Sequence, residues 1–117
     1  MLVVDDDRDI REVVTDALQA EGYHVVTAND GRAAIDWLRG AGAAPGLILL
    51  DLMMPGMDGA QFRAEQQRDP VLGAIPVVVL SADATLGAKA KSLGVAGHLK
   101  KPVPLEALLD TVRVHCR

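Results

Sequence analysis

The chain has 117 residues, of which 50% are hydrophobic and only 3% aromatic, so we expect a single domain over residues 1–117 with an aliphatic core. The formal net charge is −4 and lysine and arginine form no run, which argues against binding to nucleic acid. The apolar runs are shorter than the ~20 residues that span a membrane, and a single cysteine cannot form an internal disulfide, so we expect no membrane segment and a cytoplasmic location.

The first third of the chain predicts two strand–helix units. Residues 2–4 are apolar and indicate a short buried strand, which ends at three aspartates. A helix follows and ends at Gly22. Its expected core stripe has helical spacing and comprises Ile10, Val13, Val14, Ala17 and Leu18. Residues 24–27 form a more polar predicted strand. Asp30 is suited to cap the next helix, whose inward side chains would be Ala34, Ile35 and Leu38.

The middle of the chain centres on residues 47–50, four apolar residues that lead directly into Asp51. A loop with Pro55 and two glycines follows. An apolar run bounded by turn residues predicts a strand buried on both faces, with Asp51 at its carboxyl end. The next helix is expected over about residues 60–68, with Phe62 as its main buried side chain. Asp69 and Pro70 would end that helix.

The last third predicts two further strands, each followed by a helix. Residues 75–80 are almost entirely apolar and lead into Ser81, and a short helix is expected over residues 85–93. An interrupted strand over residues 95–99 leads into two lysines. The final helix has apolar residues at helical spacing, namely Leu105, Leu108, Leu109 and Val112.

Five successive strand–helix units predict an α/β fold of the (βα)5 type, with a doubly wound, parallel, five-stranded sheet. The first, third and fourth strands are apolar throughout, as central strands should be. The second and fifth strands contain polar residues and glycine, so they are the expected edges. This distribution matches the flavodoxin-like strand order 2-1-3-4-5.

Polar side chains follow four of these strands, and the carboxyl ends of parallel strands lie on one rim of a sheet. Asp5, Asp6, Asp51, Ser81 and Lys101 would therefore share a shallow site. Three close carboxylates repel one another unless a cation intervenes, and ligands that are all oxygen favour Mg²⁺. A metal, an ammonium group and a hydroxyl group around one carboxylate can hold a phosphoryl group. Asp51 would then be the nucleophile that forms an aspartyl phosphate.

Four motifs occur in this order: Val3-Val4-Asp5-Asp6-Asp7, Asp51-Leu-Met-Met-Pro-Gly-Met-Asp-Gly59, Leu80-Ser81-Ala82 and Lys101-Pro102. Together they resemble the receiver domain of two-component response regulators, along the whole chain. The resemblance implies that a histidine kinase or phosphotransfer protein donates phosphate to Asp51. It also implies that Asp6, Asp51 and the backbone carbonyl of Met53 bind Mg²⁺ directly. Asp5 would hold a metal-bound water, and Lys101 and Ser81 would contact the phosphoryl oxygens.

The same resemblance implies a phosphorylation-dependent switch, which catalyses only its own phosphorylation and dephosphorylation. His98 stands three residues before Lys101, where the family carries its switch aromatic residue. The peptide bond before Pro102 is expected to be cis. Phosphorylation should remodel the surface made by the helix over residues 85–93, the strand over residues 95–99 and the last helix. An output partner or a second copy of the chain would bind there.

Plainer roles stay open for several of these residues. Asp7 is expected to be a helix cap, Ser81 could be another cap, and His98 could be an ordinary surface residue. Lys100 competes with Lys101 for the site. Alternation along the strand points the two lysines to opposite faces, and the Lys-Pro pair favours Lys101.

Three other functions fit the sequence less well. A phosphohydrolase resembling the haloacid dehalogenases would need a second acid at the position of Met53. A flavodoxin-like nucleotide or flavin binder would need a phosphate-binding loop after the first strand, where three aspartates stand instead. A degenerate receiver that serves only for docking would not need the complete set of site residues.

Overall fold

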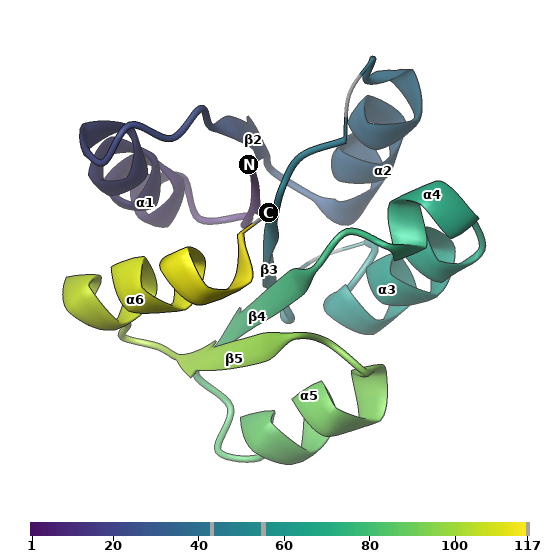
Figure 1. Cartoon of the computed structure of the whole chain (residues 1–117). Helices are drawn as coiled ribbons and strands as arrows, with labels where there is room; N and C mark the ends of the chain where they lie inside the picture. Colours follow the sequence, from purple (N-terminus) through teal and green to yellow (C-terminus); the bar gives the residue numbers. More distant parts are fainter. Residues whose placement is uncertain (43, 55, 117) are drawn as a thin grey trace.

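A five-stranded parallel sheet forms the centre of the molecule, with helices on both faces (Figure 1). The structure is a computed structural model and describes residues 1–42, 44–54 and 56–116, so Pro55 of the predicted loop lies outside the described residues. The strands are Leu2–Val4 (β1), Val26–Ala28 (β2), Ile48–Asp51 (β3), Val77–Ser81 (β4) and Gly97–Lys100 (β5). Their order is β2-β1-β3-β4-β5, which confirms the predicted α/β fold and its strand order.

Within the described residues, two helices cover one face of the sheet and four cover the other. The helices are Arg8–Ala20 (α1), Gly31–Gly40 (α2), Gly59–Gln67 (α3), Pro70–Gly73 (α4), Leu86–Leu93 (α5) and Leu105–His115 (α6). Helices α1 and α6 pack on one face through Val14, Leu18, Leu108 and Val112. Helices α2 to α5 pack on the other face, where Phe62 is fully buried as predicted. No helix in the described part of the chain is long and apolar enough to cross a membrane.

The short helix α4 was not predicted. Helix α3 does end before Asp69, but the Asp69 carboxylate then accepts hydrogen bonds from the backbone N–H groups of Val71 (2.8 Å) and Leu72 (3.3 Å). Pro70 occupies the first position of the new helix, where no backbone N–H is needed. Asp69 and Pro70 therefore end α3, as predicted, and also begin α4.

Some strand boundaries differ from the prediction. Strand β2 begins at Val26 rather than His24, whose carbonyl accepts a hydrogen bond from the N-terminal amine at 2.9 Å. Strand β4 begins at Val77, directly after Pro76, since proline has no N–H for the ladder. Strand β5 covers residues 97–100, so it begins and ends later than expected.

The predicted caps of α1 and α2 are confirmed. The Asp7 side chain accepts from the backbone N–H groups of Asp9 and Ile10, and the Asp30 side chain accepts from that of Ala33. Gly22 follows the end of α1 with φ of 91°, a left-handed conformation that glycine adopts at little cost. Local residue chemistry therefore sets these helix ends.

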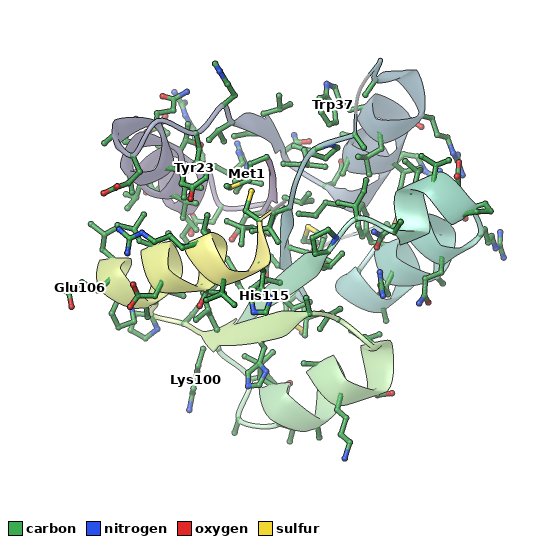
Figure 2. All side chains as sticks on the ribbon, in the orientation of Figure 1. Met1, Tyr23, Trp37, Lys100, Glu106 and His115 are labelled. Carbon is green, nitrogen blue, oxygen red and sulfur yellow. The ribbon has the colours of Figure 1, made fainter. Side chains whose placement is uncertain are left out.

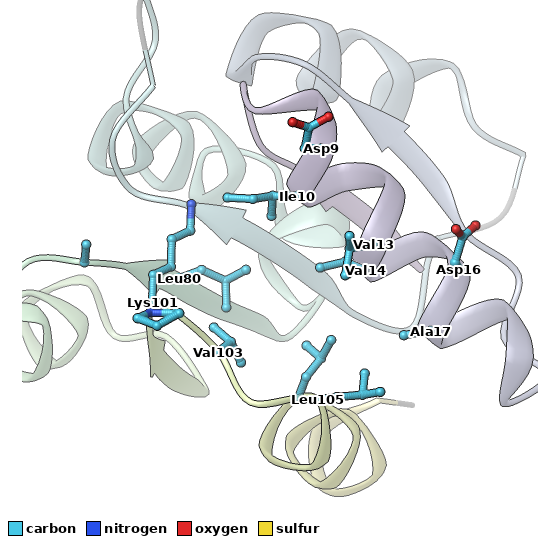
Figure 3. Close-up of a pocket in the computed structure, with 13 residues that line it drawn as sticks. Asp9, Ile10, Val13, Val14, Asp16, Ala17, Leu80, Lys101, Val103 and Leu105 are labelled. Carbon is cyan, nitrogen blue, oxygen red and sulfur yellow. The ribbon is translucent and has the colours of Figure 1, made fainter.

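The predicted core stripe of α1 is wrong at Val13, which is 66% exposed. Leu105 of α6 is also exposed, at 52%. Both side chains line an apolar hollow of about 890 Å³ between α1 and α6, which Figure 3 shows in close-up. Helical spacing identifies a face of α1, but the distance to α6 decides how much of that face is covered.

Candidate functional site

Two central strands bring three carboxylates together at the rim of the sheet. Strand β3 ends at Asp51, and β1 beside it leads into Asp5 and Asp6, with Val4 opposite Leu50 in the register. Each carboxylate offers one oxygen, and these oxygens lie within 4.8 Å of one another. Asp5 and Asp51 are buried, whereas Asp6 is exposed. The parallel register alone therefore assembles an acidic cluster.

Lys101 provides the positive charge of this cluster. Its Nζ lies 2.9 Å from Asp5 Oδ2 and 3.4 Å from Asp51 Oδ2. Burial would lower the pKa of Lys101, but the hydrogen bond to Asp5 and the charges of Asp51 and Asp5 outweigh it, so the pKa is raised. Lys100 is exposed and points away from the sheet (Figure 2). The peptide bond between Lys101 and Pro102 is cis.

The surroundings of Asp51 disfavour its ionised form and raise its pKa. Burial raises its pKa from 3.8 to about 6, and the charge of Asp5 and a hydrogen bond with Asp6 add to the increase. Two interactions oppose it: the backbone N–H of Met53 donates to Asp51 Oδ1 at 3.1 Å, and Lys101 attracts the charge. The remaining excess of carboxylate over positive charge is what a bound cation would offset.

Asp5 is held from three sides. Besides the bond from Lys101, the backbone N–H of Asp7 donates to Asp5 Oδ1 at 2.9 Å. Arg11 on α1 donates through Nη1 to the Asp5 backbone carbonyl at 2.7 Å. The sequence analysis did not identify Arg11, because an arginine on the polar side of a predicted helix gives no sign of what it reaches.

Ser81 lies at the same rim, at the end of β4. In the register Asp51 stands opposite Leu80, so Ser81 is one residue further along the neighbouring strand, and it is buried. Its Oγ accepts a hydrogen bond from the backbone N–H of Asp83 at 3.1 Å. The Asp83 carboxylate pairs with Lys89 and accepts from Thr85, and these bonds hold its pKa well below its usual range. Ser81 is therefore joined to the start of α5.

Two of the predicted site residues lie outside the acidic cluster. His98 is exposed on the edge strand β5 and faces α5, where a Cβ placed on Gly87 would be 3.8 Å from His98 Nε2. The Met53 side chain is 65% exposed, and only its backbone belongs to the site.

The donor set suits a hard divalent cation. All three candidate ligands are carboxylates, and the described residues place no histidine or cysteine with them. Oxygen-only sites select Mg²⁺, Ca²⁺ or Mn²⁺ over softer metals. Three carboxylates face the single ammonium group of Lys101, and a divalent cation would balance their remaining charge.

Comparison with known sequences agrees with this geometry. Residues 1–113 match the family profile of the response regulator receiver domain. The chain is 37% identical over 119 residues to the response regulator MprA of Mycolicibacterium vanbaalenii, covering all of this chain and 50% of that protein. MprA of Mycobacterium tuberculosis is 36% identical, with the same coverage. The chain thus spans about half the length of these curated relatives.

Solved structures show the same similarity. The chemotaxis response regulator CheY4 of Vibrio cholerae superposes with a TM-score of 0.87 at 34% identity, covering 97% of this chain and 94% of that one. The receiver domain of a signal transduction histidine kinase from Syntrophus aciditrophicus gives a TM-score of 0.85 at 28% identity, covering 97% and 86%.

Proposed function

Because the chain belongs to the response regulator receiver domain family, we propose that Asp51 is its phosphoacceptor. A receiver domain is a phosphorylation-regulated switch of a two-component system rather than a classical enzyme, and its general partner is a histidine kinase. The observation that carries the proposal is the position of Asp51 at the end of the central strand β3, between two other aspartates and Lys101. Asp5 is buried as well, but Lys101 and the Asp7 N–H already bind both of its carboxylate oxygens, and Asp51 is the acid that ends the central strand.

The reaction is a transfer of one phosphoryl group. A carboxylate oxygen of Asp51 attacks phosphorus as the P–N bond of a phosphohistidine breaks, and the imidazole keeps the electron pair of that bond. Asp51 must be ionised to attack. Lys101 favours the ionised form, since its Nζ lies 3.4 Å from Asp51 Oδ2. The Met53 N–H fixes Oδ1, which leaves Oδ2 on the lysine side as the attacking oxygen.

We propose that Mg²⁺ is the resident cation. Asp6, Asp51 and the Met53 backbone carbonyl would bind it directly, and Asp5 would hold one of its waters. The ion would supply charge neutralisation for the acids and for the phosphoryl oxygens. Asp5 suits a water-mediated role because Lys101 and the Asp7 N–H already occupy both of its carboxylate oxygens.

The switch would begin at Ser81 and Lys101, which we propose contact the phosphoryl oxygens. Phosphate adds roughly two negative charges and three strong acceptor oxygens. Ser81 would exchange its bond with the Asp83 N–H for one to phosphate. His98 would then move toward the space behind Ser81. The surface made by α5, β5 and α6 would change, and an output partner or a second copy would bind the phosphorylated form more tightly.

The apolar hollow beside the site is the surface that we propose for the phosphodonor protein. Lys101 lies at one end of it, with Ile10 and Val13 on one wall and Val103 and Leu105 on the other (Figure 3). A protein that delivers phosphate to Asp51 must cover this rim. Exposed apolar side chains next to the rim give such a protein a surface to bury.

We also propose that residues 1–117 fold as one domain that works in the cytosol. A single continuous sheet, with a hydrophobic core on each face, supports one domain. The presence of only one cysteine suits a reducing compartment.

The test is incubation with acetyl phosphate and Mg²⁺, followed by intact mass measurement and peptide mapping. We expect a gain of one phosphoryl group on Asp51 and none in Asp51→Asn. Asp58→Asn is the matched control, because Asp58 lies in the loop after β3 but caps α3 at the surface. Labelling of Asp51→Asn at the wild-type rate would disprove the assignment.

A further inference from the structure

Helix α3 carries a buried polar pair that reaches two other elements. Arg63 is 8% exposed and Gln66 is fully buried. Arg63 donates through Nε to the Leu93 carbonyl (3.1 Å) and through Nη2 to the Gly94 carbonyl (3.0 Å), both at the end of α5. Its Nη1 donates to Gln66 Oε1 at 2.8 Å. Gln66 Nε2 in turn donates to the carbonyls of Leu72 (2.8 Å) and Ile75 (3.1 Å).

This arrangement fits a cationic group at the C-terminus of a helix. The last carbonyls of a helix have no partners within it, and they form the negative end of its dipole. The Arg63 guanidinium meets two carbonyls at this end of α5, and no ion pair of Arg63 occurs among the described residues. Burial lowers the pKa of Arg63, and the carbonyl oxygens that it meets offset part of the cost of burying its charge.

The support under Arg63 is rigid. Helix α3 is fixed by fully buried Phe62 and by a capping box between Asp58 and Gln61. The bonds of Gln66 tie the same helix to α4 and to the approach to β4. The C-terminal end of α5 is therefore attached to a part of the molecule that has little freedom to move.

The opposite end of α5 is attached differently. Thr85 at its N-cap makes no side-chain capping bond, and this end is linked through Asp83 to Ser81. Buried Leu86 packs this end on the core, so the N-terminal end is held by an apolar contact and by Asp83 and not by a buried charge.

We propose that Arg63, held by Gln66, anchors the C-terminal end of α5, so that α5 pivots about this end when the receiver switches. The inference rests on the proposed function, because movement of Ser81 toward phosphate would displace the N-terminal end. Arg63 acts as a positioning residue, and it touches neither Asp51 nor its partners among the described contacts.

Hydrogen exchange in the metal-free protein tests the anchor. The variant Arg63→Met removes the donors, and Arg63→Met/Gln66→Leu replaces the pair with apolar groups of similar size so that the fold is kept. We expect exchange at the Gly94 and Val95 amides, which bond to the last turn of α5, to become at least about tenfold faster in both variants. Arg39→Met is the control, because Arg39 pairs with Glu65 of α3 at the surface. Unchanged exchange at Gly94 and Val95 in the folded double variant would overturn the anchor.

NMR with beryllofluoride and Mg²⁺ tests the pivot. In the wild type we expect larger chemical-shift changes at residues 86–89 than at residues 91–95, and in the double variant we expect the changes to extend along all of α5. Equal changes at both ends of wild-type α5, with changes around Asp51 present, would overturn the pivot alone. The absence of any change around Asp51 would instead overturn the proposed function and, with it, the pivot that rests on it.

Discussion

Replacement of Asp51 by asparagine should change how the stability of the metal-free protein depends on pH. The pKa of Asp51 is raised from 3.8 to about 6 in the folded state, chiefly by burial. The folded protein therefore binds a proton more readily than the unfolded chain. Stability from this group is fully present below about pH 4 and is lost as the pH rises through about 6. Asparagine has nearly the same size and cannot titrate, so this pH dependence should disappear.

The size of the effect follows from the two pKa values. A pKa of about 6 against 3.8 corresponds to about 3 kcal/mol between the two protonation limits. Only ~1.4 kcal/mol of this falls between pH 5 and pH 8, since full protonation needs a lower pH. Lys101 is partly exposed at the mouth of the site, so water screens the charges there. We therefore expect about 1 kcal/mol, or roughly 4 °C in Tm for a chain of this size.

The assay is urea and thermal unfolding at pH 5 and pH 8 in the presence of a chelator, for wild type and Asp51→Asn. From pH 5 to pH 8, the unfolding free energy of wild type should fall by about 1 kcal/mol more than that of Asp51→Asn. Asp16→Asn, which changes an exposed acid on α1, should behave as wild type. Equal pH dependence in wild type and Asp51→Asn would refute the argument that burial and neighbouring acids raise the pKa of Asp51.

Four further outcomes are expected. Mg²⁺ should raise the Tm of wild type at pH 8, and Asp6→Ala should lose most of that gain in differential scanning fluorimetry; an Asp6→Ala gain equal to wild type would contradict the metal site. Val13→Asp should slow phosphotransfer from a phosphodonor protein at least about tenfold by gel assay, with acetyl phosphate labelling unchanged; equal slowing of both would argue against docking in the hollow. Ser81→Ala and His98→Ala should each reduce the NMR chemical-shift changes that beryllofluoride causes in α5 and β5, while Asp51 can still be phosphorylated. Changes of full wild-type size in both variants would contradict the switch. Phe62→Ala should cost about 3–5 kcal/mol of unfolding free energy in urea, against less than about 1 kcal/mol for exposed Val71→Ala.

Much of the fold could be predicted because its signals are local. An apolar run that ends in a carboxylate identified β3 and Asp51, and side-chain caps placed the starts of α1 and α2. Parallel strands put their carboxyl ends on one rim, so the sequence order of Asp5, Asp6, Asp51 and Lys101 was enough to predict that they would meet. Alternation along a strand separated Lys101 from Lys100.

Other features needed the tertiary structure because they depend on the distance between elements far apart in the chain. Helical spacing placed Val13 on the inner face of α1, but the gap between α1 and α6 left it exposed. Arg63 and Gln66 occupy helical spacing with Gly59 and Phe62, which could have indicated a buried face. Because both residues are polar, the sequence did not indicate that this face is buried. Only the folded chain brings the carbonyls of α5 to Arg63, and these carbonyls offset the cost of burying its charge.

For the chemistry of the site, too, part could be predicted from the sequence and part depended on the tertiary structure. Residue types and their order in the sequence determined that a carboxylate would meet two other acids and an ammonium group. The raised pKa of Asp51 and the paired state of Asp5 were decided by packing. Burial and the 2.9 Å contact between Lys101 and Asp5 exist only when the residues that end or follow β1, β3 and β5 meet at one rim of the folded sheet. Desolvation and Coulomb energies vary steeply over a few ångströms, and spacing along a chain does not specify distances of that order.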